Sequence, residues 1–492
     1  TSLRDVATAA RLIPQPYGRA LAFGFALALG LAQAFGLLAI VAEAGIGSSS
    51  AAAAAENRDE KTGEKTGEKR DKKPKVGADV VFRQVTIHDG SGGPAVVGDL
   101  AIRGDKIAGV GTFQVAGKPR EIDGRGLIAA PGFIDLHSHS DPEITKDRLR
   151  VNDNFLWQGV TTVVTGNCGG GEADTAAYLK KVEQGGAGTN VAHLIPHGAI
   201  RRIVMKDERR PPTDAELERM RKLVDQGMRD GAWGMSTGLI YVPSKYAEID
   251  ELVELSKVVA KYKGVYASHI RNEGSGLLRA IEEALSIGRR AGVAVHISHI
   301  KVSGRSAWGL SAEAVRVIEA ARADGMKVTA DQYPYVASST SLAAMVVPDD
   351  VQTKERLEAA LADPKRAEEL RADLRSALAA RDGGKSLVVA RYSPRPKWQG
   401  RDLAAIGRDE QRDPVEIVLE IQRGGGAQMV SFGMSEEEVR FFMRFPFVAT
   451  ASDGGTKIPD DTAPHPRSYG TFPRRIGRYA IEERVVPVEA AI

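Results

Sequence analysis

The chain has 492 residues, of which 42% are hydrophobic and 27% charged, enough for one large barrel with accessory segments or for two to three ordinary domains. The formal net charge of +3 is too small to indicate nucleic-acid binding. A single cysteine excludes an intramolecular disulfide, so Cys168 is either a small buried hydrophobic residue or a residue with a chemical role.

The first 45 residues have the pattern of an export signal. Three arginines lie within residues 1–19, and an uncharged apolar run follows from Ala20 to Ala42. A run of about 20 residues or more is long enough to span a bilayer as a helix. Ala42-Glu43-Ala44 is similar to a small-residue cleavage site. We therefore predict that residues 1–45 are a signal peptide or an uncleaved membrane anchor, and that the rest is exported, either periplasmic or extracellular or tethered to the membrane.

A low-complexity segment and a small β domain come next. Residues 46–75 contain a serine and alanine run and a Glu-Lys-Thr-Gly repeat without apolar periodicity, which predicts a disordered linker. Within residues 76–130, apolar and polar residues alternate over Asp79–Ile87 and Gly98–Ile107, with turn residues between them. This pattern predicts a small antiparallel β unit.

From residue 131 to 492 the pattern alternates between strands and helices, which predicts a parallel sheet. Apolar residues three or four apart predict helices over Asp214–Arg229, Ile249–Tyr262, Gly276–Ala291 and Ala312–Ala323. The predicted strands are Phe133–Leu136, Val160–Thr165, Val191–Pro196, Gly234–Thr237, Val265–Ser268, Ala294–Ser298, Lys327–Ala330 and Phe447–Ala451. Eight strand-helix units indicate a TIM (β/α)8 barrel, in which the chemistry lies at the carboxyl ends of the strands.

About a hundred residues, from Leu342 to Arg444, separate the last two predicted strands. This connection is far longer than an ordinary barrel loop, so it is an insertion. We predict helices over Thr353–Ala362 and Pro364–Ala380 and a strand over Lys385–Tyr392.

The residues that follow the predicted strands suggest a metal site. His137 and His139 lie two apart at a strand end, so they share a face. An isolated His-x-His pair is more often structural than metal-binding. The other strand ends change this balance, because they carry Cys168, His269, His299 and Asp453. Nitrogen and thiolate ligands suit zinc, and an open coordination position would make the site catalytic.

At this point the chain resembles the D-aminoacylase (N-acyl-D-amino-acid deacylase) family of the amidohydrolase superfamily, from about Val76 to the C-terminus. Many relatives place a carbamylated lysine after strand four, where Gly234–Leu239 has none, and D-aminoacylases use a cysteine after strand two, which is the position of Cys168. The motifs that carry the resemblance are Gly132-Phe133-Ile134-Asp135-Leu136-His137-Ser138-His139, Gln158-Gly159-Val160-Thr161-Thr162, Gly166-Asn167-Cys168-Gly169, Ser268-His269-Ile270-Arg271-Asn272-Glu273, Ser298-His299-Ile300-Lys301, Tyr333-Pro334-Tyr335, Ser452-Asp453-Gly454 and His465-Pro466-Arg467.

The resemblance implies an amidohydrolase-type barrel with a small β-sandwich domain that hydrolyses N-acyl-D-amino acids to a carboxylate and a D-amino acid. It implies one tight zinc held by Cys168, His269 and His299. It also implies a weaker second position formed by His137, His139 and Asp453, with Cys168 bridging.

In such a site Asp453 would act as general base and then as general acid. The partners that we expect for the substrate α-carboxylate are Lys301, Tyr333 and Arg467. The alternatives are a related amidohydrolase acting on D-dipeptides or cyclic amides, and an inactive membrane-tethered binding protein on the same barrel.

Other polar residues have more ordinary interpretations. We expect structural roles for His193 and His197, and a supporting role near the site for His465. His296 is three residues from His299 on one strand, so it should face the other way. Asp141 is expected to cap a loop.

Two further expectations come from comparison with the family pattern. Relatives continue beyond the position of Ile492 with strands that complete the small β domain, so this domain is expected to be incomplete and the C-terminus truncated. No arginine occurs from Ala337 to Asp350, which favours neutral or hydrophobic D-amino acids as substrates.

Overall fold

The structure, a computed structural model, describes residues 74–492 and divides into two compact units between Pro131 and Gly132. The predicted signal or anchor at residues 1–45, and nearly all of the predicted linker at 46–75, lie outside the described residues. Within residues 74–492, no helix combines the length and the apolar character needed to cross a membrane.

The first unit is built from two small sheets. β2, β3 and β4 are antiparallel as predicted, whereas β6 and β7 run parallel to β2, so the prediction of an antiparallel unit is wrong for these two strands. The reason is that the chain leaves the sheet after β4 and pairs β5 with β1 before it returns. Buried residues lie on both faces of β2, with Val81 on one and Phe82 on the other. The strands are β1 (Lys75–Gly77), β2 (Val80–Ile87), β3 (Val96–Arg103), β4 (Lys106–Gly111), β5 (Gln114–Ala116), β6 (Arg120–Asp123) and β7 (Ile128–Ala129).

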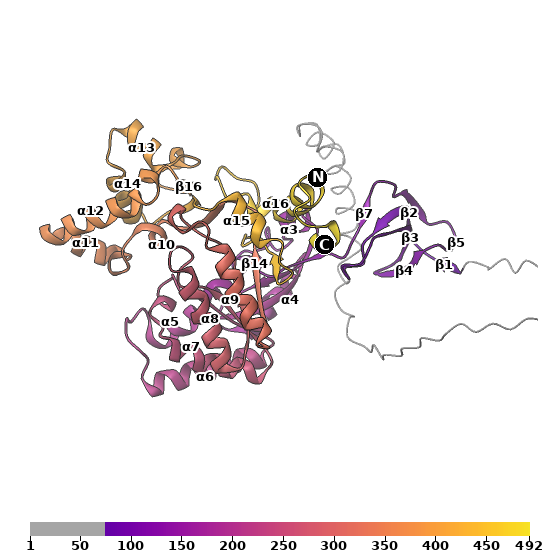
Figure 1. Cartoon of the computed structure of the whole chain (residues 1–492), viewed down its shortest axis with the longest axis horizontal. Coiled ribbons are helices and arrows are strands. Elements are labelled where there is room, and N and C mark those ends of the chain that lie inside the picture. Colours follow the sequence, from indigo (N-terminus) through magenta and orange to yellow (C-terminus); the bar gives the residue numbers. More distant parts are fainter. Residues whose placement is uncertain (1–73) are drawn as a thin grey trace, which may run out of the picture. The chain divides into compact units, whose positions relative to one another are not determined.

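The second unit contains the predicted eight-stranded parallel sheet (Figure 1). Each strand pairs in parallel with the next one, and every observed strand overlaps a predicted strand. The strands are β8 (Phe133–Asp135), β9 (Val160–Thr165), β10 (Asn190–Pro196), β11 (Gly234–Gly238), β12 (Val265–His269), β13 (Ala294–Ile297), β14 (Val328–Gln332) and β18 (Val448–Thr450).

The sheet closes into a barrel beyond the ends of its first and last strands. Ser138, just after β8, forms a parallel bridge with Gly454, just after β18. The amide of Asp453 donates to the His137 carbonyl at 2.8 Å, and the amide of His139 donates to the Gly454 carbonyl at 2.7 Å. The residues that close the barrel are therefore the ones that carry the predicted ligands from the first and last strands.

Helices cover the outside of the sheet, and one large apolar core joins them to the strands. Thr213 begins α6 with a reciprocal capping box to Glu216, which satisfies two backbone donors at the helix start. The helices between β8 and β14 are α3 (Asp153–Leu156), α4 (Thr175–Gly185), α5 (His197–Met205), α6 (Asp214–Arg229), α7 (Ile249–Lys261), α8 (Leu277–Ala291) and α9 (Ser311–Ala323), with short η turns at Asn167–Gly169, Ser244–Tyr246 and Arg305–Ala307. The four predicted helices are α6, α7, α8 and α9, each within one residue of its predicted ends.

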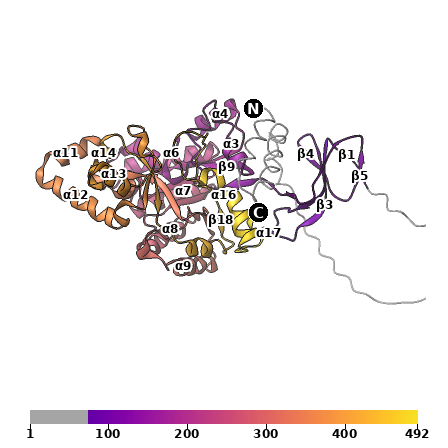
Figure 2. The ribbon, with the colours of Figure 1, turned by 90° about the horizontal axis from the view of Figure 1, so that it is seen from above.

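The insertion between β14 and β18 forms a three-stranded antiparallel sheet with its own helices and apolar core. Its helices α11, α12, α13 and α14 lie together at one end of the second unit (Figures 1 and 2). Its strands are β15 (Ala337–Ser341), β16 (Leu387–Arg391) and β17 (Gln428–Phe432); its helices are α10 (Leu342–Val346), α11 (Lys354–Ala362), α12 (Pro364–Ala379), α13 (Leu403–Glu410), α14 (Pro414–Arg423) and α15 (Glu436–Phe442), with short η turns at Asp349–Val351, Asp382–Gly384 and Pro396–Trp398.

Sequence patterns predicted β16, α11 and α12 but missed β15 and β17. The β15 sequence Ala-Ser-Ser-Thr-Ser has no apolar alternation that could indicate a strand. Beyond β18 the chain forms α16 (Arg467–Arg474), the π-helical segment η8 (Arg475–Glu482) and α17 (Val488–Ala491).

Candidate active site

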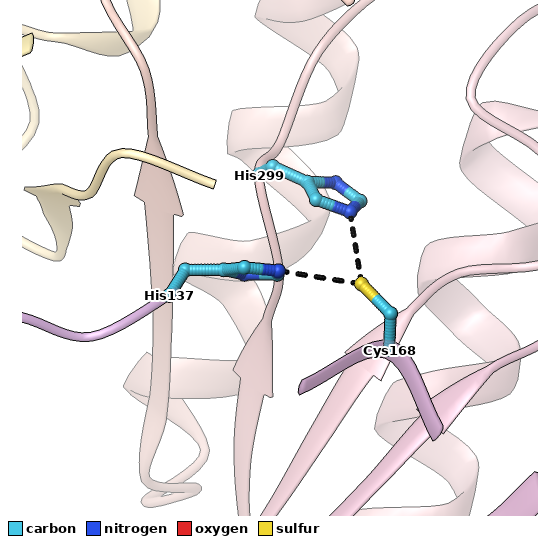
Figure 3. Close-up of side chains that lie close together, drawn as sticks. All are labelled: His137, Cys168 and His299. Carbon is cyan, nitrogen blue, oxygen red and sulfur yellow. Dashed lines mark hydrogen bonds between the residues drawn. The ribbon is translucent and has the colours of Figure 1, made fainter. Parts of the chain in front are cut away.

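One cysteine and three histidines converge at the carboxyl ends of the barrel strands. The Cys168 Sγ lies 3.3 Å from His137 Nε2, 3.6 Å from His269 Nδ1 and 3.5 Å from His299 Nε2. Figure 3 shows His137 and His299 pointing toward this sulfur from two different segments of the chain. All four side chains are buried.

These spacings fit a shared metal ion. The sulfur and nitrogen ligands of one tetrahedral zinc, bound at about 2.3 Å and about 2.0 Å, lie about 3.5 Å apart. Burial lowers the pKa of His137 to about 4 and keeps its imidazole neutral, which is the metal-binding form. Burial also raises the pKa of the Cys168 thiol well above its usual value, so a thiolate there needs a cation beside it.

Asp453 forms a second possible metal group with the two histidines of the first strand. Its Oδ1 lies 3.1 Å from His139 Nε2 and 3.6 Å from His137 Nε2. Its Oδ2 accepts a hydrogen bond of 2.7 Å from the Arg467 guanidinium. Burial alone would raise the pKa of Asp453, but Arg467 and the surrounding histidines hold it well below the usual value. The structure therefore places an ionised carboxylate beside the cysteine-histidine cluster.

Asp331 was not singled out from the sequence, yet it connects three of the histidine positions. Its Oδ2 lies 3.2 Å from His137 Nδ1 and 2.7 Å from His296 Nε2, and its Oδ1 accepts the His299 amide at 2.8 Å. By holding Nδ1 of His137, Asp331 leaves Nε2 directed at the cysteine. Asp331 is the penultimate residue of β14 and directly follows the predicted strand Lys327–Ala330, so the same strand-end pattern that indicated the ligands could have indicated it as well.

The prediction that His296 faces away from the site is wrong, because its Nε2 lies 2.7 Å from Asp331 Oδ2, the same oxygen that contacts His137 Nδ1. The alternation of a strand holds only as far as Ile297, where β13 ends. His299 has a φ of +36°, which turns its side chain toward Cys168.

Glu273 is a second residue that no role was predicted for. Its Oε1 lies 2.9 Å from His299 Nδ1 and 2.5 Å from the Lys301 ammonium. Lys301 Nζ is also 2.7 Å from His299 Nδ1. Lys301, predicted to bind substrate, thus already has a carboxylate partner and contacts a candidate ligand. The signal that could have found Glu273 is its position four residues after His269.

Close backbone approaches position the cysteine. Cys168 and Asp453 adopt positive φ values of 54° and 49°, which are uncommon for residues with side chains and frequent at functional sites. Gly166 precedes the cysteine with φ +75°, and a Cβ there would lie 2.0 Å from the Leu194 carbonyl oxygen. A Cβ on Gly238 would lie 2.1 Å from the Cys168 carbonyl oxygen. Only glycines allow this loop to pack so closely on its neighbouring strands.

A pocket of about 510 Å³ opens above these groups. Two of its surfaces have distinct origins. We call the first the pocket floor; it consists of the predicted ligands His139, Cys168, His269, His299 and Asp453, which come from the barrel, and His137 is buried next to them. We call the second the insertion wall; it consists of Ser338, Ser339, Thr340, Arg391 and Gln428, which come from β15, β16 and β17.

The remaining two predicted substrate-binding residues line the same pocket. The Arg467 guanidinium lies 4.9 Å from the centre of the Tyr333 ring and also donates to the Ser339 carbonyl at 3.0 Å. The Tyr333 hydroxyl is buried and makes no hydrogen bond within the described part of the chain. The Arg467 backbone amide donates a hydrogen bond of 3.0 Å to His465 Nδ1, so His465 helps to position this arginine.

The other polar residues considered in the sequence have partners outside the floor. His193 lies 3.0 Å from the Thr165 hydroxyl, and His197 lies 2.9 Å from Glu251. Asp141 accepts the Gly166 amide at 2.6 Å, so it holds the loop that leads to Cys168.

Comparison with known proteins agrees with this geometry. A barrel with ligands at its strand ends defines the class of the amidohydrolases, and the family model described as "Amidohydrolase family" matches residues 120–492. More narrowly, the chain belongs to the D-aminoacylase family, as the predicted resemblance implied. It is 35% identical over 437 residues to a D-aminoacylase of Alcaligenes xylosoxydans xylosoxydans, covering 84% of this chain and 81% of the relative.

Two solved structures of the family extend the comparison. The first is a D-aminoacylase that has a binuclear metal centre. It superposes with a TM-score of 0.69 at 32% identity, covering 84% of this chain and 83% of that one. An N-acyl-D-glutamate deacylase from Bordetella bronchiseptica, complexed with zinc and a phosphonate mimic of the tetrahedral intermediate, has a TM-score of 0.70 with the same identity and coverage. Both the predicted family and the predicted fold are confirmed.

Proposed function

We propose that this protein hydrolyses the amide bond of N-acyl-D-amino acids, releasing a carboxylate and a D-amino acid, with zinc as its metal. The observation that carries the proposal is the convergence of three histidines on the Cys168 sulfur at the spacing of shared zinc ligands, with the Asp453 carboxylate beside them. The names of the family relatives support the same reaction.

Cys168, His269 and His299 would hold the tight zinc. His137, His139 and Asp453 would form the weaker second position, with Cys168 between the two. When bound, zinc would make a water molecule more acidic and polarise the scissile carbonyl.

Asp453 is placed to move the proton during hydrolysis. Its Oδ2 is fixed by Arg467, while Oδ1 faces the histidines of the floor and the pocket. An ionised carboxylate held in this way accepts a proton from the attacking water and then returns it to the leaving amine. The hydrogen bond from Arg467 keeps Asp453 ionised before the reaction begins.

The α-carboxylate of the substrate would bind among Lys301, Tyr333 and Arg467. The Lys301 ammonium and the Arg467 guanidinium lie 5.5 Å and 4.9 Å from the centre of the Tyr333 ring, so two positive charges lie beside this side chain. A carboxylate arriving there would accept the hydrogen bond that the buried hydroxyl does not make within residues 74–492.

The test uses the full chain, its metal content, and amine release from N-acetyl-D-methionine and N-acetyl-L-methionine. We expect about one zinc per chain and hydrolysis of the D enantiomer only, lost in Asp453→Ala. Bound zinc without turnover of either enantiomer would indicate a different amide, such as a D-dipeptide or a cyclic amide. A folded protein that binds no metal would contradict the assignment of the floor.

We further propose export, because the arginine-flanked apolar run of residues 20–42 supports a signal peptide or an anchor. Fractionation of cells that produce the full chain, with N-terminal sequencing of the product, tests this. Cleavage near residue 45 indicates a signal peptide, an intact chain in the membrane fraction indicates an anchor, and an intact chain in the cytosol contradicts export.

A further inference from the structure

The charge lining the pocket exceeds what its own carboxylates can balance. Five cationic side chains line it against the two carboxylates Glu273 and Asp453. The cationic residues are Arg202, Lys301, Arg391, Lys457 and Arg467. Three of these have carboxylate partners, since Lys301 pairs with Glu273 at 2.5 Å, Arg467 with Asp453 at 2.7 Å, and Arg202 with Asp207 at 3.0 Å.

The other two, Arg391 and Lys457, form no ion pair with any residue of the described chain. They come from different segments, Arg391 from the end of β16 and Lys457 from the loop after β18. Both act on Asp460, whose pKa is lowered first by hydrogen bonds from Thr462 and then by these two charges. The Asp460 carboxylate is bound to Thr462 and lies beyond ion-pair distance of both cations.

The surface next to these cations is polar. Gln428 pairs with Arg391 across the insertion sheet, and its amide donates to the Ser339 hydroxyl at 3.0 Å. Ser338 and Thr340 continue the same side of the pocket. An apolar substrate group against this surface would leave hydroxyl and amide groups without water, whereas a charged or polar group can pair with them.

We propose that Arg391 and Lys457 form an anion subsite for a second carboxylate of the substrate, separate from the α-carboxylate. This carboxylate belongs either to the amino-acid side chain or to the acyl group. The inference deepens the proposed function and rests on it. It reverses the preference for neutral substrates that the missing arginine between Ala337 and Asp350 had suggested, because the cations come from β16 and from the loop after β18 instead.

The experiment compares three substrates on the same D-amino-acid frame. N-acetyl-D-glutamine carries no second charge, N-acetyl-D-glutamate carries it on the side chain, and N-succinyl-D-glutamine carries it on the acyl group. We expect kcat/KM for one of the dicarboxylates to exceed that for N-acetyl-D-glutamine by about tenfold or more, as a charge-assisted hydrogen bond would give. The preferred dicarboxylate identifies whether the amino-acid side chain or the acyl group reaches the subsite.

The variants test whether the two cations cause this preference. In the double variant Arg391→Met and Lys457→Met, we expect the ratio of kcat/KM values to fall about tenfold, and the ratio of the wild type to fall as salt is added. Arg391→Lys keeps the charge and should keep most of the preference. Arg408→Met is the matched control, since Arg408 is an exposed cation of the insertion outside the pocket.

Three outcomes would overturn the inference alone: a wild type without preference for either dicarboxylate, an unchanged ratio in the double variant, or an equal loss on all three substrates. Absence of turnover with every one of the three by the wild type would instead overturn the proposed function, and the subsite with it. Turnover of N-acetyl-D-glutamine therefore separates the two failures.

Discussion

The pocket floor and the insertion wall face the same cavity but are held in opposite ways. In the floor, Cys168, His299 and Asp453 are buried, and hydrogen bonds to charged groups fix two of them: the His299 amide donates to Asp331, and Asp453 accepts from Arg467. In the wall, Arg391 is exposed, and its side chain makes no ion pair in the described chain. The side chains of the floor are therefore fixed before a substrate arrives, while the Arg391 side chain of the wall is free to adjust its position.

This difference assigns different tasks to the two surfaces. Groups that act on the reacting bond must be positioned in advance, because small misplacements are costly in rate. Groups that select among substrates can adapt, and their loss changes the ratio of rates more than the rate itself. We therefore expect changes in the floor to lower activity on every substrate, and changes in the wall to alter preference.

The largest effect should follow from removing Asp453, the proposed proton acceptor of the floor. In Asp453→Asn we expect activity on all substrates to fall by about 10²- to 10⁴-fold, because the amide cannot accept the proton. Initial rates of amine release, with circular dichroism to verify folding, measure this. Asp461→Asn is the control, since Asp461 is an exposed carboxylate that does not line the pocket. A variant with more than a tenth of wild-type activity would contradict the role of Asp453.

A buried ionic cluster outside the floor should affect stability rather than preference or proton transfer. Glu251 lies 2.9 Å from His197 Nε2 and 3.1 Å from the Arg201 guanidinium, and all three are buried. We expect Glu251→Gln to lower the free energy of unfolding by about 3 kcal/mol, because it leaves the buried Arg201 charge without a carboxylate partner. Urea unfolding at pH 7 measures this, and less than about 1 kcal/mol would contradict it.

The same cluster predicts how stability depends on pH. Burial alone would raise the pKa of Glu251, but His197 and Arg201 hold it below its ordinary value of 4.5. A carboxyl group whose pKa is lowered by folding stabilises the protein above the unfolded-state value, and this stabilisation is lost as the pH falls through the folded-state value. Wild-type Tm should therefore decrease below about pH 4.5 more steeply than that of Glu251→Gln. Parallel curves would exclude Glu251 as a source of acid sensitivity.

Next in size is the support of the floor by Asp331. In Asp331→Asn we expect metal affinity to fall about 10- to 100-fold, as when a hydrogen-bond partner of a ligating histidine is removed. Competition with a chelator measures this. Glu283→Gln is the control, because Glu283 pairs with Arg271 at 2.8 Å and does not line the pocket. Equal affinity in wild type and Asp331→Asn would mean that Asp331 has no part in positioning His137.

The contrast between floor and wall also explains which parts of the site could be predicted from the sequence. The ligand candidates follow regular strands, so a count of strands and of the residues after them brought His137, Cys168, His269, His299 and Asp453 together without coordinates. The same reasoning failed for His296, because strand alternation stops where the backbone of His299 turns to positive φ. It failed for the wall, because β15 has no apolar pattern and its partner β17 lies about ninety residues away, at Gln428–Phe432.

The smallest expected effect comes from Tyr333. It tests whether this residue contributes to the activity on every substrate or to the preference among substrates. Tyr333→Phe removes only a hydroxyl that is buried without a hydrogen bond in the part of the chain described. If this hydroxyl binds the substrate α-carboxylate, KM should rise about 2- to 10-fold with little change in kcat, the size of one net hydrogen bond. If it binds nothing, removing a buried unpaired polar group should raise Tm and leave KM unchanged.

Tyr178→Phe is the matched control, because the Tyr178 hydroxyl is also buried but does not line the pocket. A rise in KM for Tyr333→Phe alone, equal for neutral and dicarboxylate substrates, would place Tyr333 with the residues that bind what all substrates share. A rise confined to the dicarboxylates would instead mean that Tyr333, like the residues of the insertion wall, helps to select among substrates.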